Sequence, residues 1–151
     1  MTRPVNTMKL EFDGRSINES FARSAVAAFV AQLDPTVEEL CDIRTAVSEA
    51  VTNCIVHAYP DTLGRVYISA AIYAGGRVII RVKDKGCGIP DVKQAMEPLF
   101  TTGAAQERSG LGFSVMQSLM DRVTVRSKPQ GPTVVTLERR LISKGDTDAR
   151  V

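Results

Sequence analysis

Three polar side chains recur at helical spacing in segment 48–60, which has the sequence Ser-Glu-Ala-Val-Thr-Asn-Cys-Ile-Val-His-Ala-Tyr-Pro. Glu49, Asn53 and His57 follow one another at four-residue intervals, so a helix would place them on one stripe of its surface. The rest of the segment is largely small or apolar, and a buried polar group without a partner costs about 1–3 kcal/mol. The stripe is therefore either a hydrogen-bonded pair on a half-exposed helix or one wall of a site that faces a metal ion and phosphate.

Length and composition indicate one ordinary globular domain. The chain has 151 residues, of which 44% are hydrophobic and 24% charged, and its net charge of +2 is too small to indicate nucleic-acid binding. No run of apolar residues is close to the length of about 20 residues that spans a bilayer, and the N-terminus lacks the pattern of a signal peptide. We therefore expect a single domain over 1–151, with a frayed tail from about 143, in the cytoplasm and without a membrane or nucleic-acid partner.

The three cysteines indicate a reducing compartment. Cys41, Cys54 and Cys87 are odd in number and form no Cys-x-x-Cys pair. We expect reduced thiols and neither disulfides nor metal ligands.

Two helices are predicted before the main group of strands. Alternating apolar residues at 8–12 predict an opening strand, and Ser-Ile-Asn-Glu at 16–19 has the pattern of a capping box, which begins a helix. Asp34 followed by Pro35 predicts the N-cap of a second helix, which continues until Pro60. The polar stripe therefore belongs to the C-terminal end of this second helix.

The second half of the chain is mostly predicted strand. Period-two alternation at 66–72 and 78–82, with a Gly75-Gly76 turn between them, predicts a β-hairpin. One further helix and two further strands are predicted at 113–120, 123–127 and 133–139.

The first glycine-containing segment, 84–88, follows a predicted strand and has the pattern Asp-x-Gly-x-Gly. Asp84 places a carboxylate at the edge of the sheet, where it can accept a hydrogen bond from an exocyclic amine such as that of adenine. Gly86 and Gly88 have no Cβ, so a flat ligand can approach the backbone closely. The alternative is a plain tight turn. No helix pattern follows at once and no third glycine is present, so this is not a Rossmann loop.

The second glycine-containing segment, Ser-Gly-Leu-Gly at 109–112, precedes a predicted helix. Unpaired N–H groups at the start of a helix bind phosphate well, although the segment lacks the Gly-Lys-Ser/Thr of a Walker A loop. Residues 91–109 are poor in apolar periodicity and are a candidate lid. Arg108 at its end is either a solvated loop arginine or a group that neutralises a terminal phosphate.

The order of these segments resembles the GHKL superfamily of ATPases and kinases. Its N, G1 and G2 boxes are matched by 49–53, 84–88 and 110–112, and the resemblance covers roughly 8–141. It implies an α/β sandwich of the GHKL (Bergerat) type, in which a mixed, mainly antiparallel sheet carries helices on one face and nucleotide lies between the two layers.

Within the superfamily, four segments closely resemble the anti-sigma F factors of sporulating bacteria: 18–23, 48–53, 98–102 and 107–112. That resemblance implies an ATP-dependent serine kinase. It would bind and inhibit a sporulation sigma factor, sigma F, and phosphorylate a serine of its anti-anti-sigma factor. A homodimer is also implied.

The resemblance implies a role for each residue of the site. Asn53 would ligate Mg²⁺, and Glu49 would position or deprotonate the attacking serine hydroxyl. Asp84 would hold the adenine amine of ATP or ADP, while His57 would either touch the ligand or end the helix. The phosphates would be contacted by the second glycine segment and the residues before it: Thr102, Arg108, Ser109, Gly110, Leu111 and Gly112.

Three other functions share these motifs. An anti-sigma kinase of the general stress response would match almost everything above, and a non-catalytic module could use ATP only to shape a sigma-binding surface. The ATP-binding half of a histidine kinase needs an acceptor histidine on a dimerisation helix, but the single histidine of this chain, His57, lies inside the N box.

Overall fold

The computed structural model describes residues 2–97 and 112–142. Within these ranges the chain forms strands and helices in the following order: β1 (Asn6–Asp13), α1 (Ile17–Val30), the 3₁₀ turn η1 (Ala31–Leu33), α2 (Val37–Thr52), the π-helix η2 (Asn53–Ala58), β2 (Arg65–Tyr73), β3 (Arg77–Asp84), α3 (Val92–Ala95), α5 (Phe113–Leu119), β4 (Arg122–Ser127) and β5 (Thr133–Arg140).

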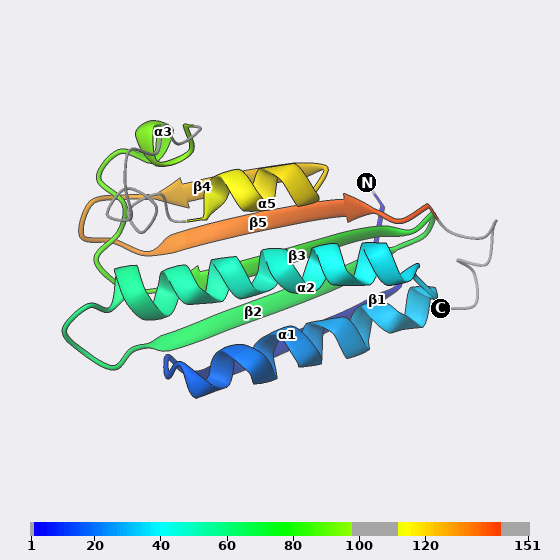
Figure 1. Ribbon diagram of the computed structural model, residues 1–151, viewed down its shortest axis with the longest axis horizontal. Helices are drawn as coiled ribbons and strands as arrows, with labels where there is room; N and C mark the ends of the chain where they lie inside the picture. The colour runs from blue at the N-terminus through cyan, green and yellow to red at the C-terminus, as the bar shows by residue number, and fades with distance from the viewer. Residues whose placement is uncertain (1, 98–111, 143–151) are drawn as a thin grey trace.

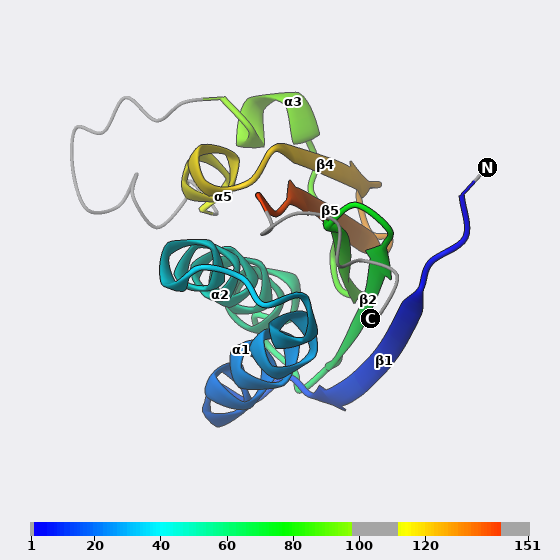
Figure 2. The ribbon, with the colours of Figure 1, turned by 90° about the vertical axis from the view of Figure 1, so that its right-hand side faces the viewer.

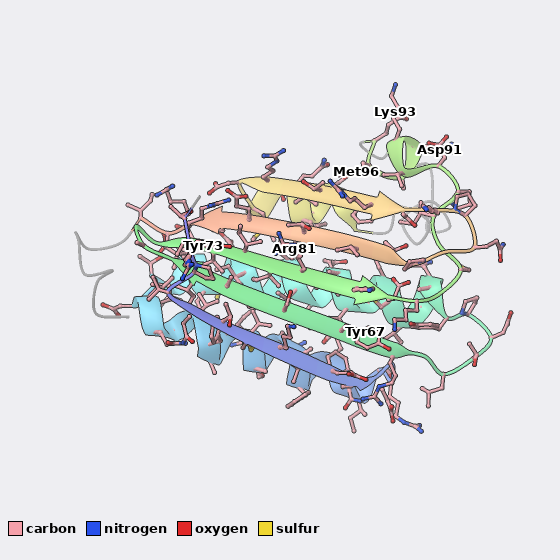
Figure 3. The ribbon with its side chains drawn as sticks, turned by 180° about the vertical axis from the view of Figure 1, so that it is seen from behind. Tyr67, Tyr73, Arg81, Asp91, Lys93 and Met96 are labelled. Carbon is pink, nitrogen blue, oxygen red and sulfur yellow. The ribbon has the colours of Figure 1, made fainter. Side chains whose placement is uncertain are left out.

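The strands form a five-stranded sheet in the order β1-β2-β3-β5-β4, and every neighbouring pair in the described residues is antiparallel. Helices α1, α2 and α5 cover one face of this sheet (Figures 1 and 2). The other face is open, and Tyr67, Tyr73 and Arg81 lie on it (Figure 3). An antiparallel sheet tolerates one solvated face because its strands alternate apolar and polar residues. The predicted two-layer α/β sandwich is confirmed.

The core lies between the sheet and the helices. The alternation predicted for 66–72 and 78–82 is present, because their apolar residues are buried while intervening polar residues such as Tyr67 and Arg81 face outward. The hairpin turn is also confirmed, since Gly75 and Gly76 both have positive φ. The largest buried side chains come from both layers: Phe113, Ile43, Ile68, Ile72, Ile80, Met116 and Leu137.

Two further sequence expectations concern the cysteines and the membrane. Cys41, Cys54 and Cys87 are free thiols, as predicted. Among the described helices, none combines the length and the apolar composition that a membrane crossing requires.

The start of α1 differs from the prediction. Ser16 has helical dihedral angles (φ −60°, ψ −30°) and makes no capping hydrogen bond. A capping side chain acts from an extended backbone, so Ser16 cannot reach the first N–H groups. Glu19 forms an ion pair with Arg23 instead of closing the box. The predicted capping box at 16–19 is therefore wrong, although the helix itself is confirmed.

The N-cap of α2 lies two residues after the predicted one. Asp34 adopts a left-handed conformation (φ 52°, ψ 55°) and ends the η1 turn. The N-cap is Thr36, whose hydroxyl accepts from the Glu39 N–H at 3.0 Å. The Glu39 carboxylate accepts from the Thr36 N–H at 2.9 Å. A complete capping box therefore exists, but at 36–39.

Glu39 has a second role. Its side chain is buried, and its other oxygen accepts from the N–H of Ile142 at 2.7 Å. One carboxylate thus ties the segment after β5 to the beginning of α2. Hydrogen bonds to an ionised group are about twice as strong as neutral ones, so this contact is a strong link between the layers.

Candidate functional site

The polar stripe spans a change of helix type. Glu49 lies in the last turn of α2, whereas Asn53 and His57 lie in the π-helix η2, which ends at Ala58. A π-helix bonds residue i to residue i+5, so the chain no longer follows α-helical geometry after Thr52. The prediction of one α-helix carrying all three residues is therefore corrected, although Asn53 and His57 line the same pocket.

A cavity of about 260 Å³ opens beside η2. Its walls combine apolar side chains with a few polar groups, which is typical of a site for a small ligand. Residues from η2, the end of β3, α5 and β5 line it together: Asn53, His57, Asp84, Gly88, Phe113 and Thr133. Several of the residues predicted for nucleotide binding thus meet in one pocket.

Asp84 presents a buried carboxylate to this pocket. It is 4% exposed, and one oxygen accepts from the Gly86 N–H at 2.9 Å. Burial raises the pKa of Asp84, while interactions of its carboxylate with the Gly86 N–H and the Cys54 thiol oppose the shift. An ionised carboxylate held here can accept a further hydrogen bond from a ligand amine.

The neighbouring Cys54 remains a thiol. Burial and the Asp84 charge raise its pKa well above the ordinary value, so it donates to the carboxylate. Burial also lowers the pKa of His57, so its imidazole is neutral at pH 7.

The glycines of 84–88 are needed for packing within the protein. A Cβ on Gly86 would lie 2.2 Å from the Ala58 carbonyl oxygen, and one on Gly88 would lie 1.8 Å from that of Lys128. Gly88 also has φ +78°. The missing Cβ atoms thus let the loop contact η2 on one side and the β4–β5 turn on the other. That both glycines also make room for a flat ligand stays a prediction.

Backbone hydrogen bonds hold this loop on both sides. The Cys87 N–H donates to the Ala58 carbonyl at 3.0 Å, and the Cys87 carbonyl accepts from the Gln130 N–H at 2.7 Å. The pocket wall that carries Asp84 is thus fixed to two separate elements.

Tyr59 supports the wall of the pocket, and sequence reasoning missed it. Its hydroxyl accepts from the Lys85 N–H at 2.7 Å and donates to the Arg65 carbonyl at 2.8 Å. It therefore joins the end of η2 to β2 and to the residue after Asp84. A Cβ on Gly64 would lie 2.2 Å from the Tyr59 ring, so that glycine leaves the space the ring occupies.

Thr133 is a second missed residue. It is 5% exposed, lines the pocket, and is the cross-strand partner of Asp84 in the β3–β5 register. The two residues are distant in the chain, and no local pattern indicates which positions face each other. Knowledge of the register between β3 and β5 would have identified Thr133 as the residue opposite Asp84.

Glu49 lies against the beginning of α5. A Cβ built on Gly112 would approach the Glu49 carboxylate oxygen to 2.4 Å. The predicted base and the last glycine of the second glycine segment are therefore neighbours. Burial raises the pKa of Glu49, and the negative charge of Glu19 adds to that shift.

Asn53 has the properties expected of a ligand-binding amide. Its Nδ2 is buried and finds no acceptor among the described residues. Buried polar atoms in proteins are normally satisfied, so a bound group that supplies an acceptor would stabilise this side chain. An amide oxygen is a ligand type that Mg²⁺ accepts, with phosphates and water completing its shell. The residue present therefore fits a magnesium–phosphate group.

The remaining predicted phosphate contacts lie outside the described residues: Thr102, Arg108, Ser109, Gly110 and Leu111. Of the predicted lid at 91–109, only the first residues are described. They contain the short helix α3, whose N-cap Asp91 accepts from the Gln94 N–H at 3.0 Å.

The sequence and the fold match known proteins. Residues 15–138 match the family described as histidine kinase-like ATPase domain. Among solved structures, the RsbU and RsbW domains of Rv1364c from Mycobacterium tuberculosis give a TM-score of 0.63 at 21% identity, covering 91% of this chain and 33% of that chain. The catalytic domain of the histidine kinase ThkA gives 0.55 at 15% identity, covering 89% and 96%. These structural likenesses concern the fold.

The sequence identity to several curated proteins is much higher. The anti-sigma F factor of Thermoanaerobacter sp. (strain X514) is 54% identical over 135 residues, which cover 89% of this chain and 94% of the relative. That of Heyndrickxia coagulans is 51% identical over 142 residues, covering 92% and 95%. The chain therefore belongs to the anti-sigma F factors, within the histidine kinase-like ATPase family.

Proposed function

We propose that this anti-sigma factor is an ATP-dependent protein serine kinase. It binds and inhibits sigma F and phosphorylates a serine of the cognate anti-anti-sigma factor. The observation that carries the kinase proposal is the placement of a half-buried carboxylate, Glu49, one helical turn from Asn53 and against Gly112. A module that only binds nucleotide does not need a carboxylate at the end where the phosphates would lie.

The residues divide the work of binding. Asp84 accepts the adenine amine, and Asn53 offers its amide to Mg²⁺ and the phosphates. Mg²⁺, when bound, neutralises phosphate charge during transfer. We propose that the phosphates accept hydrogen bonds from the backbone N–H groups of Gly110, Leu111 and Gly112. The side chains of Thr102, Arg108 and Ser109 add further phosphate contacts.

Glu49 is the proposed general base. It accepts the proton of the substrate serine hydroxyl as the serine oxygen bonds to the γ-phosphorus and the bond to ADP breaks. The transferred groups balance: phosphoserine and ADP form, and the proton rests on the Glu49 carboxylate. Burial of Glu49 favours this proton transfer because a raised pKa makes the carboxylate a better proton acceptor.

The wider assignments are also proposals. We propose that residues 1–151 act as one domain, that the chain forms a homodimer, and that it works in the cytoplasm. The family membership supports them, and the described fold is compatible with each.

The test is phosphotransfer with purified components. The chain, ATP and Mg²⁺ are mixed with the cognate anti-anti-sigma protein, and phosphoserine is identified by mass spectrometry. ATP-dependent sigma binding without transfer would favour the non-catalytic module. Sigma factors that co-purify with the chain are identified in parallel. A general-stress sigma factor in place of sigma F would favour the related stress-response kinase.

The raised pKa of Glu49 predicts that the rate of phosphotransfer decreases at acid pH. The base must be ionised, so kcat for transfer falls as pH decreases through the Glu49 pKa, which burial and Glu19 place above 4.5. Glu19→Gln removes one cause of the shift and moves this decrease to lower pH. The measurement is kcat against pH at saturating substrate, with the exposed Glu38→Gln on α2, the helix that carries Glu49, as control. An unchanged pH dependence in the Glu19 variant would contradict the coupling.

Gly112→Ala is expected to reduce transfer at least tenfold. Gly112 has φ +69°, and the new methyl group would collide with the Glu49 carboxylate. Gly75→Ala is the matched control, since it has φ +88° but meets only the end of the Arg140 side chain at 3.3 Å. Both variants lose about 1 kcal/mol of stability from backbone strain. Equal activity of the two variants would contradict the role of the Gly112–Glu49 contact.

A further inference from the structure

A pair of hydroxyl groups connects the loop after Gly88 to the pocket. Ser127, the last residue of β4, accepts a hydrogen bond from the Ile89 N–H at 2.8 Å. Its Oγ lies 2.6 Å from the Oγ1 of Thr133, the first residue of β5 and its cross-strand partner. Thr133 in turn lies opposite Asp84 across β3 and β5. The two hydrogen-bonding contacts thus connect the loop to Thr133, which lines the pocket and is paired in register with Asp84.

The direction of the Ser127–Thr133 hydrogen bond decides what Thr133 can offer a ligand. Each hydroxyl has one proton, so whichever residue donates between them leaves the other free to donate elsewhere. The Ile89 N–H already donates to Ser127 Oγ, and hydrogen bonds in a chain polarise one another. The hydrogen bond that Ser127 accepts from Ile89 therefore favours Ser127 as the donor to Thr133. The hydroxyl proton of Thr133 is then free to point into the pocket.

Adenine has a matching pair of groups on one edge. Its exocyclic amine donates, and the adjacent ring nitrogen N1 accepts. A carboxylate beside a hydroxyl donor complements this edge. The corresponding edge of guanine presents a carbonyl and an N1–H, so it would place an acceptor against Asp84 and a donor against the donor of Thr133.

We propose that Ser127 is a specificity-determining residue that directs the Thr133 hydroxyl proton to N1 of bound adenine. Ser127 does not touch the base itself. It acts through Thr133, while Asp84 accepts the neighbouring amine. This inference rests on the proposed function only in taking the pocket as the adenine site.

The test uses nucleotides altered at single ring atoms. Binding of ATP, 1-deaza-ATP and 7-deaza-ATP to the full chain is measured by calorimetry for wild type and Ser127→Ala. The variant is expected to bind ATP and 7-deaza-ATP about five- to tenfold more weakly, the size of one net hydrogen bond. 1-Deaza-ATP lacks the acceptor nitrogen, so wild type and variant should bind it equally. If Ser127 had only a structural role, Ser127→Ala would bind all three nucleotides more weakly by the same factor, and that result would overturn the proposal.

Companion variants keep the result interpretable. Ser127→Thr retains the hydroxyl and should restore ATP affinity, and Thr133→Val combined with Ser127→Ala should be no weaker than Thr133→Val alone. Thr124→Ala, on the open face of the same strand, is the control for changes to β4. Equal ATP binding by wild type and Ser127→Ala would overturn the inference alone. Failure of the wild type to bind any adenine nucleotide would instead reject the proposed function.

Discussion

Glu49→Gln is expected to lower kcat for serine phosphorylation by about 10²–10⁴ while leaving ATP affinity within about twofold of wild type. Glutamine has nearly the same shape, so it keeps the contact with Gly112 and the helical packing of α2. It cannot accept the serine proton. The measurements are single-turnover transfer to the anti-anti-sigma protein and calorimetric binding of ATP with Mg²⁺.

The control for this variant is Glu38→Gln, an exposed position at the opposite end of α2. It should transfer phosphate at the wild-type rate. Undiminished transfer by Glu49→Gln would reject the general-base role. A large loss of ATP affinity would instead move Glu49 from catalysis to nucleotide binding.

Asp84→Asn is expected to weaken ATP binding about 100-fold. The substitution replaces an acceptor oxygen with an NH₂ group, which would face the donor amine of adenine. Two donors then face each other without an acceptor, and leaving buried polar groups unpaired in this way weakens binding strongly. The stability of the protein without nucleotide should not fall. Burial raises the pKa of Asp84, so its charged form costs stability in the folded protein, and the neutral amide can still accept from the Gly86 N–H.

Thermal unfolding with and without ATP separates these two effects. Purine riboside triphosphate, which lacks the amine, should bind wild type and Asp84→Asn with similar affinity. The exposed Asp61→Asn should bind ATP normally. Unchanged ATP affinity in Asp84→Asn would contradict the adenine assignment of the pocket.

The strands were predictable because their signal is local. Alternation at 66–72 and 78–82 requires only that one face of the sheet be buried, and the helices supply that cover. The Gly75-Gly76 turn likewise needs only positive φ at adjacent residues. Such features depend on neighbours in the chain, so composition and period identify them.

Helix ends were less predictable because several residues compete for the same role. Ser16 and Asp34 both have capping side chains, but Ser16 is itself helical and Asp34 ends the preceding turn. Thr36 takes the cap since its extended backbone and Glu39 complete the box. The π-helix at 53–58 has no local signal either: its end is held by contacts from the loop at 84–88.

The site was predictable where a motif carries it and unpredictable where strand pairing carries it. Asn53 and Asp84 belong to recognisable patterns and meet in the pocket. Tyr59, Ser127 and Thr133 contribute through contacts between segments far apart in the chain. A single sequence does not encode those contacts in any local pattern.

The Glu39 carboxylate also decides where a reporter group can be attached. It anchors Ile142 at the N-terminal end of α2, whereas the pocket lies at the C-terminal end of that helix. A helix of 16 residues is about 24 Å long. The Ile142 side chain is 85% exposed, so a fluorophore attached at this position through an introduced cysteine would report unfolding at a distance from the nucleotide. Cys41 and Cys87 are also exposed and would have to be replaced first, so that the label is confined to position 142.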